Sequence, residues 1–241
     1  MSRKQAPAQQ RPIVLVFGES EHDRRAIKLL VEGLRPELAG LVEERRQPLV
    51  LIKNALPEKA RSNAEKIASI ARIEARTRRV VAVLAHEDCD ALEPDHVRVA
   101  EKLEKELSDA GCPHPAAVTP AWETETWWLI FPEAVGKVVA GWRLPDDWLG
   151  KDVGRVEHAK EKLAKAVQPR SSRKSPPRAY HERDSIAIAQ NIVADKLLRS
   201  FEGGRRSTPH PSGSTMHTRS ASFEKFRIKV LAISTGEARG A

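Results

Sequence analysis

The chain of 241 residues is long enough for one large domain, or for one domain with a smaller appendage. Apolar residues make up 40% of it, enough for a core, but no stretch approaches the roughly 18 apolar residues of a membrane helix. The two cysteines, Cys89 and Cys112, exclude a disulfide framework, and we expect a reducing, cytoplasmic environment. The net charge of +8 lies entirely in residues 170–241, which hold 14 Lys and Arg against 6 Asp and Glu, whereas residues 1–169 hold 27 of each. Such a basic surplus attracts polyanions, above all nucleic acid, although a solubilising tail would have the same composition.

Residues 1–11 are polar and basic, and they are predicted to form a disordered leader instead of a secretion signal. Four strand–helix pairs follow. The predicted strands are 13–17, 49–52, 80–85 and 116–118, and the helices after them are 21–34, 57–78, 94–110 and 123–131. Each strand is a short apolar run, typical of a strand buried on both faces. The alternation predicts an α/β core over residues 12–131, with a mainly parallel, Rossmann-like sheet flanked by helices.

The pattern changes after residue 131. Helices are predicted over 156–167, 184–198 and 222–233, and turn-rich or basic segments at 169–178 and 203–220 are predicted to be flexible loops. We therefore expect residues 132–241 to form a basic, mostly α-helical extension packed beside the core.

Acidic residues follow three of the predicted strands. They are Glu19 and Glu21 after the first strand, Glu87, Asp88 and Asp90 after the third, and Glu123 and Glu125 after the fourth. Because the carboxyl ends of parallel strands share one edge of a sheet, we expect these side chains to meet there. Clustered carboxylates repel one another and favour a hard divalent cation, usually Mg²⁺. The pattern therefore indicates phosphate chemistry.

Asp88 and Asp90 are the best candidates for metal ligands, because their i, i+2 spacing places both carboxylates on one side of an extended segment. A solvated loop with a helix cap at Asp90 is the alternative. Glu19 is a candidate metal ligand or general base, or else a helix-capping acid. Glu21 and Glu125 are second-line acids. Glu21 fits the first turn of a helix better than a site, Glu125 completes the acidic cluster or has no role in it, and Glu123 is a further candidate for a first-turn acid.

Other chemistry has weaker signals. His86, Cys89, Cys112 and His114 offer four zinc ligands, but their spacing fits no structural zinc site well and carboxylates would crowd the ion. There is no Walker loop, no G-x-G-x-x-G and no G-x-S-x-G motif. Basic residues of the last third are candidates for contacts with a nucleic-acid backbone, which need charge but little geometry. They are Arg170, Arg173, Lys174, Arg178, Arg205 and Arg206.

An acid after the first strand, then a helix, then a D-x-D after a later strand resembles the Toprim domain of topoisomerases, bacterial primases and overcoming-lysogenization-defect nucleases. More narrowly, residues 12–233 resemble a family of uncharacterised bacterial Toprim-like proteins that are often linked to defence systems. The matching stretches are VFGESEHD (16–23), VAVLAHEDCD (81–90), WETETWWL (122–129), YHERDSIAIA (180–189) and SASFEKF (220–226).

The resemblance implies that Glu19 matches the Toprim Glu, which acts in acid–base catalysis or metal binding, and that Asp88 and Asp90 match the metal-binding D-x-D, with Glu87 and His86 beside them. If the family's first Asp directly follows the strand, the matched pair is instead His86 and Asp88. A His in place of an Asp weakens Mg²⁺ binding and favours Mn²⁺.

The expected function is a Mg²⁺-dependent endonuclease acting on DNA or RNA. The resemblance adds a role as effector of an anti-phage defence or toxin system, with an activating or inhibiting partner such as an ATPase. Two alternatives stay open. One is a non-catalytic nucleic-acid- or partner-binding subunit with a degenerate site, and the other is phosphotransfer or hydrolysis on a small nucleotide.

Overall fold

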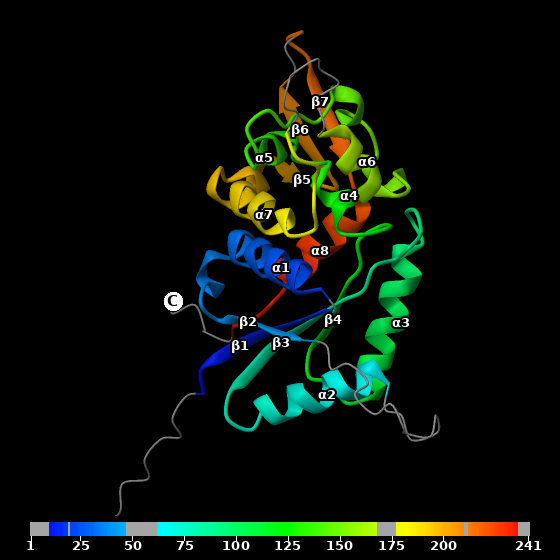
Figure 1. The fold of residues 1–241 in the computed structure, drawn as a ribbon. Helices are drawn as coiled ribbons and strands as arrows, with labels where there is room; N and C mark the ends of the chain where they lie inside the picture. Colours follow the sequence, from blue (N-terminus) through cyan, green and yellow to red (C-terminus); the bar gives the residue numbers. More distant parts are fainter. Residues whose placement is uncertain (1–9, 19, 47–61, 168–176, 210–211, 236–241) are drawn as a thin grey trace, which may run out of the picture.

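The fold is built on a sheet of four parallel strands in the order β2-β1-β3-β4 (Figure 1). The strands are β1 (Pro12–Gly18), β2 (Val42–Arg46), β3 (Arg79–His86) and β4 (Pro115–Val118). The computed structural model describes residues 10–18, 20–46, 62–167, 177–209 and 212–235. Three predicted strands are confirmed, and the predicted α/β class with a parallel sheet is confirmed with them.

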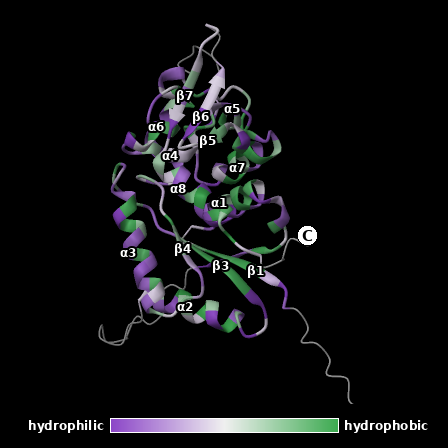
Figure 2. Cartoon of the chain, turned by 180° about the vertical axis from the view of Figure 1, so that it is seen from behind, coloured by the Kyte–Doolittle hydropathy of each residue, from purple (hydrophilic) through white to green (hydrophobic). Residues whose placement is uncertain are grey.

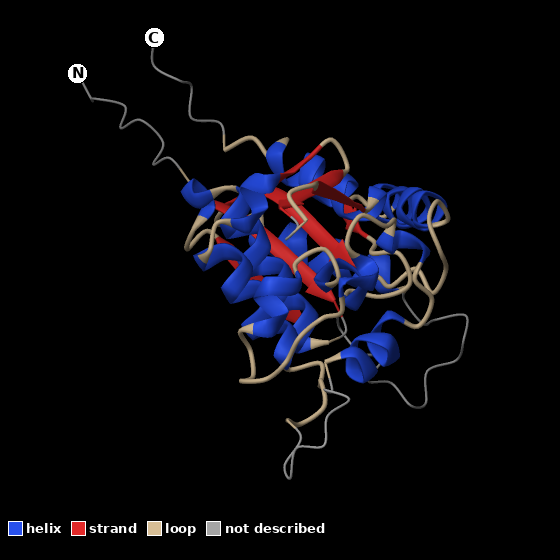
Figure 3. Ribbon diagram, turned by 90° about the horizontal axis from the view of Figure 1, so that it is seen from above, coloured by secondary structure: helices blue, strands red, loops and turns tan. Residues whose placement is uncertain are grey.

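Helices cover both faces of this sheet. The helices are α1 (Glu21–Leu34), α2 (Asn63–Glu74), α3 (His96–Asp109), α4 (Glu125–Trp128), α5 (Pro132–Gly136), α6 (Ala159–Ala166), α7 (Asp184–Ala194) and α8 (Ala221–Leu231). Short 3-10 turns are formed by Pro36–Leu38, Asp146–Trp148, Val153–Arg155 and Leu197–Ser200. α2 and α3 lie on one side of the sheet, and α1 and α8 on the other, with the remaining C-terminal elements stacked beyond α1 (Figure 1). Viewed from above, the strands are surrounded by helices (Figure 3).

Strand β1 is buried on both faces of the sheet. Val14 and Val16 pack into the core beneath α1, whereas Ile13, Leu15 and Phe17 pack into a second core beneath α2 and α3. All five side chains are buried because successive residues of a strand point to opposite faces. The hydrophobic strands β1 and β3 lie between helices that carry hydrophilic residues, as Figure 2 shows for α2 and α3. No described helix is long and apolar enough to cross a bilayer.

Strand β2 is a polar edge strand that the hydrophobic pattern did not reveal. Only Val42 is buried, and Glu43 and Arg45 instead form ion pairs with side chains next to β3. Arg45 lies 2.9 Å from Glu74, and Glu43 lies 2.5 Å from Arg78. The predicted strand 49–52 lies outside the described residues.

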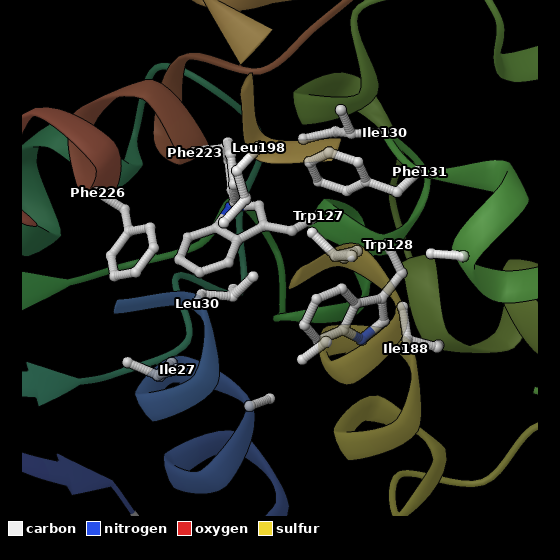
Figure 4. Close-up of a cluster of buried hydrophobic side chains, with 14 of the residues drawn as sticks. Ile27, Leu30, Trp127, Trp128, Ile130, Phe131, Ile188, Leu198, Phe223 and Phe226 are labelled. Atoms are coloured by element: carbon white, nitrogen blue, oxygen red, sulfur yellow. The ribbon is translucent and has the colours of Figure 1, made fainter. Parts of the chain in front are cut away.

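Two tryptophans join the C-terminal part of the chain to the sheet (Figure 4). Trp127 stacks on Phe226 of α8, with ring centroids 5.0 Å apart, and its indole nitrogen donates to Ser222 Oγ at 3.1 Å. Trp128 donates to Ser185 Oγ of α7 at 3.0 Å. Because both indoles are fully buried, residues before and after position 131 share one continuous core.

Residues 203–220, expected to be a flexible loop, form most of a small antiparallel sheet. Its strands are β5 (Phe201–Glu202), β6 (Arg205–Pro209) and β7 (Thr215–Arg219), in the order β5-β6-β7. The inward positions of β6 and β7 are Arg206 and Thr218, so no alternation of apolar residues marks these strands in the sequence. The extension is therefore not wholly helical.

Glu93, which precedes α3, ties that region to the start of α8. Its carboxylate accepts hydrogen bonds from Ser220 Oγ (3.1 Å), Ala221 N (2.9 Å) and Ser222 N (2.8 Å). These two amides open a helix and have no partner within it, so an acid there is favourable. Gly154 makes room for it, because a Cβ at that position would lie 2.0 Å from the Glu93 carboxyl carbon.

Replacing Glu93 with Ala should lower the free energy of unfolding by about 2 kcal/mol, because three donors lose their shared charged acceptor. Urea denaturation followed by tryptophan fluorescence measures this change. The matched control is Glu101→Ala on the exposed face of α3. Equal denaturation midpoints for the two variants would contradict the capping role.

Candidate functional site

A cavity of about 480 Å³ lies where β1, β3 and β4 end. The register of the sheet explains its place, because Phe17 is paired with Ala85 and His86 with Val118. The residues that follow these strands therefore share one edge, as parallel strands require. The cavity is lined by Ser20, Asp23, Asn63, His86, Glu87, Asp88, Asp90, Glu123, Glu125, Lys160 and Glu182. We call it the acidic pocket, since seven of these eleven residues carry carboxyl groups.

Backbone hydrogen bonds hold the loop that carries Asp88 and Asp90. Glu87 N donates to Val118 O, Cys89 N to Pro120 O and Trp122 N to Ala91 O, at 3.2, 3.3 and 2.8 Å. These bonds continue the pairing of β3 with β4 beyond the strands. Cys89 is buried, while Asp88 and Asp90 both line the pocket. The segment is not regularly extended, because Asp90 has a left-handed backbone with φ of 51° and Glu87 lines the pocket as well.

The predicted acids have three different outcomes. Asp88, Asp90, Glu87 and Glu125 come together in the pocket. Glu19 lies outside the described residues, and its role stays a prediction. Glu21 does not line the pocket, because it is exposed and pairs with Arg25 at 3.2 Å, one turn along α1.

Asp23 occupies the place in α1 for which Glu21 was considered. It lies four residues before the buried Ile27, so the helical period turns it inward to the pocket. Burial raises its pKa, and the charge of Asp88 adds to the rise. The S-E-H-D sequence carried this signal, since Ser20 caps the helix and fixes its register by accepting from the Asp23 amide.

His86 is a charge partner of Asp88. Its Nε2 lies 3.2 Å from Asp88 Oδ1 and 3.0 Å from Thr124 Oγ1. Burial alone would lower the pKa of the imidazole, but the hydrogen bond with Asp88 and the charges of Asp88, Asp23 and Glu125 outweigh it, and the pKa is raised. The role of His86 as a metal ligand stays a prediction.

Glu123 and Lys160 connect the pocket to α6. Glu123 Oε1 accepts from the Lys160 backbone amide at 2.6 Å, and the Lys160 ammonium forms an ion pair with Glu182. Glu123 is thus a helix-capping acid, and burial together with the nearby charges of Glu161 and Asp88 raises its pKa. Sequence spacing could not reveal Lys160 and Glu182, because they come from segments without a strand before them.

Glu125 is the most deeply buried acid of the pocket. Burial raises its pKa to about 8, even though a hydrogen bond from the Tyr180 hydroxyl, 2.7 Å away, lowers it. A carboxyl group with this pKa is largely protonated at neutral pH, unlike an exposed carboxylate.

The donors of the pocket suit a hard divalent cation in their chemistry, because carboxylate oxygens dominate and burial and mutual charge raise the pKa values of three of them. Among the described residues, however, no three His, Cys, Asp or Glu side chains are already gathered closely enough to hold an ion. The zinc set does not assemble within the described part of the chain, and burial raises the pKa of the Cys112 thiol to about 11.

The predicted phosphate-binding residues differ in their surroundings. Arg170, Arg173 and Lys174 lie outside the described residues. Arg205 is exposed on β6. Arg206 is buried, where it donates to Ile130 O and pairs with Glu133. The prediction that its guanidinium faces solvent is therefore wrong. The buried ion pair hides this arginine inside the small sheet.

Arg178 serves the fold. Its guanidinium donates two hydrogen bonds of 2.6 Å to the buried carboxylate of Asp184 at the start of α7, and it lies 5.2 Å from the centre of the Trp142 ring. Burial would raise the pKa of Asp184, but the Arg178 hydrogen bonds outweigh it and lower the pKa.

Replacing Arg178 with Gln should lower the free energy of unfolding at pH 7 by about 2 kcal/mol, because Asp184 loses its charged donors. A lowered folded-state pKa means that the stabilisation is present above the unfolded pKa of 3.8 and is lost as pH falls through the folded value. The difference from the wild type should therefore shrink in acid. Urea denaturation at about pH 7 and about pH 3 tests this, with Arg155→Gln at an exposed position as control. A pH-independent difference would contradict the assignment.

None of the protein-family models, curated proteins or solved structures compared with the chain matches it. The functional argument therefore rests on the acidic pocket itself: its place at the carboxyl ends of three parallel strands, its seven carboxyl groups and the loop that holds Asp88 and Asp90.

Proposed function

We propose that the protein hydrolyses phosphodiester bonds of nucleic acid with the help of a divalent cation. The observation that supports this most is the convergence of Asp88 and Asp90 in a carboxylate-lined pocket, on a loop held by backbone hydrogen bonds. Rigid placement of acids is what a cation site for phosphate chemistry needs, because the geometry is then fixed before the substrate binds.

Asp88 and Asp90, together with Glu19, would hold the cation. When bound, it would supply charge stabilisation for the phosphate oxygens in the transition state. The protein's own contribution is to position the carboxylates and to compensate part of their charge. Asp88 is half exposed, with 39% of its side chain accessible, so it is open to solvent while His86 fixes it from behind.

A non-catalytic binding subunit is the second candidate, and one observation favours it. The imidazole of His86 already pairs with Asp88 at 3.2 Å, so a protonated His86 could compensate the charge that a metal would otherwise neutralise. In this case the pocket would be a stable relic, and the basic surfaces alone would carry the function.

Among the described residues, the outer face of the small sheet is the surface best suited to bind the nucleic-acid backbone. Arg205 and Arg219 are directly opposite each other on β6 and β7, and both are exposed. With Arg199 they line a hollow of about 620 Å³, which Glu202, the register partner of Arg205 on β5, lines as well. None of the three arginines forms an ion pair with another described residue. Opposed like charges destabilise a sheet, so a bound phosphate would relieve this repulsion.

Changing Asp88 to Asn should reduce metal-dependent cleavage by about 100-fold or more, because the cation loses a fixed carboxylate. The assay compares supercoiled DNA, linear DNA and tRNA with Mg²⁺ or Mn²⁺. Glu21→Gln is the matched control, since this acid lies outside the pocket and should leave the rate unchanged. Cleavage by Asp88→Asn at the wild-type rate would place the chemistry elsewhere, and the absence of cleavage by the folded wild type would favour the binding subunit.

The double change Arg205→Gln and Arg219→Gln should weaken binding to nucleic acid of any sequence and reduce the slope of log K against log salt by about 2, one for each lost phosphate contact. Fluorescence anisotropy at several salt concentrations measures the slope. The control removes the same charge from α3 with Lys102→Gln and Lys105→Gln, both exposed. Equal slopes for the two double variants would exclude the small sheet as the binding face.

A further inference from the structure

Behind the acidic pocket, four buried side chains form a chain of hydrogen bonds that the cation site does not use. Trp128 Nε1 donates to Ser185 Oγ at 3.0 Å, Ser185 Oγ lies 2.7 Å from the Tyr180 hydroxyl, and that hydroxyl donates to Glu125 Oε1 at 2.7 Å. The exposed fractions are 0% for Trp128, 1% for Ser185, 4% for Tyr180 and 5% for Glu125. Only the last of them lines the pocket.

The Trp128 indole determines which atom donates in each of these hydrogen bonds, because its N–H can only donate. Ser185 accepts that hydrogen bond and is then free to donate to Tyr180, which donates to Glu125 Oε1. One oxygen of Glu125 is thereby engaged from inside the protein. A dissociable proton on this carboxyl would therefore sit on Oε2, the oxygen that Tyr180 does not occupy.

The four hydrogen-bonded residues come from two regions of the fold. Glu125 and Trp128 are three residues apart on α4, and Ser185 lies in the first turn of α7, with Tyr180 just before it. Trp128 packs against α7 beside Ile188 (Figure 4). The position of the Glu125 carboxyl thus depends on the contact between α4 and α7 and on Tyr180, in the segment that leads into α7.

We propose that Glu125 is the group that exchanges a proton with a ligand bound in the acidic pocket, and that Tyr180 is the residue that positions it. This role rests on the proposed hydrolysis. In that reaction the electron pair of the breaking phosphorus–oxygen bond stays on the leaving oxygen, which takes its proton from Glu125. The attacking water gives up one proton to the solvent, and the Glu125 carboxylate recovers one proton from the solvent, so the acid is regenerated.

The surroundings of Glu125 support a protonated resting state. The charges that face it are those of Asp23 from α1, Glu123 from its own segment, His86 from β3 and Lys160 from α6, and the hydroxyl of Tyr180 completes the set. Burial raises the pKa of Glu125 to about 8 against the hydrogen bond from Tyr180. The half-exposed Asp88, in contrast, is paired with His86. Two acids in such different environments suit different roles in one site.

Tyr180 is the only tyrosine of the chain, and this makes the proposal measurable without any activity. With tyrosine isotope-labelled at the ring carbon that bears the hydroxyl, the protein gives a single nuclear magnetic resonance signal from this position. The pKa of Tyr180 itself is well above its usual value of 10, so a change of the signal at lower pH reports on the neighbouring Glu125.

The wild type should show one step in this signal, with a midpoint near pH 8. The step should be absent in Glu125→Gln, which keeps the acceptor for Tyr180, and retained in Glu101→Gln, which removes an exposed acid of α3 outside the pocket. A wild-type signal without a step, or a step that persists in Glu125→Gln, would overturn the proposal.

Cleavage assays then separate this role from the proposed function. If the wild type cuts nucleic acid, Glu125→Gln should lose about 100-fold in rate. Tyr180→Phe should shift the alkaline limb of the pH profile upwards, because the lost hydrogen bond had lowered the pKa of Glu125. Unchanged rates and pH profiles in both variants would overturn the proton-transfer role. If the wild type does not cut, the proposed function fails, while the tyrosine titration still decides whether Glu125 exchanges a proton.

Discussion

Electrostatic repulsion within the acidic pocket is the constraint on which the site depends. Seven carboxyl groups line one cavity, and their charges together with burial disfavour full ionisation. The protein compensates in three ways. His86 pairs with Asp88, Lys160 pairs with Glu182, and burial raises the pKa of Glu125 to about 8 so that it can stay neutral. A divalent cation would compensate the remaining carboxylates more strongly than these groups do, which is why the pocket suits one.

This compensation needs the C-terminal half of the chain. The sheet and α1 bring Asp23, Asp88 and Asp90 together, but Lys160, Tyr180 and Glu182 come from segments beyond residue 131. Those segments are held in place by the buried indoles of Trp127 and Trp128, which bond to side chains of α8 and α7. A core that crosses the expected domain boundary is therefore also what completes the site.

The sequence was sufficient for residues whose position follows from the backbone alone. Apolar runs marked three strands, and acids that directly follow β3 lie in the pocket because the carboxyl ends of parallel strands share one edge. The sequence was insufficient for strands that are stabilised by ion pairs with distant segments. β2 and β6 have few apolar residues, since their charged side chains find partners from distant segments, such as Glu43 with Arg78 and Arg206 with Glu133. Periodicity on α1 could have shown that Asp23 and not Glu21 faces inward, because Asp23 lies one turn before the buried Ile27.

The distribution of charge separates substrate binding from cleavage in the proposed function. A pocket of carboxylates would repel nucleic acid, and the exposed arginines of the small sheet, which lies beyond α1 and α8 from the large sheet (Figure 1), would attract it. Binding at the basic face does not require the pocket, whereas a phosphate can enter the pocket only when positive charge reduces the repulsion there. A cation held by Asp88 and Asp90 would supply that charge, and His86 and Lys160 alone leave the carboxyl groups in excess. In the proposed function, binding and cleavage therefore depend on different residues.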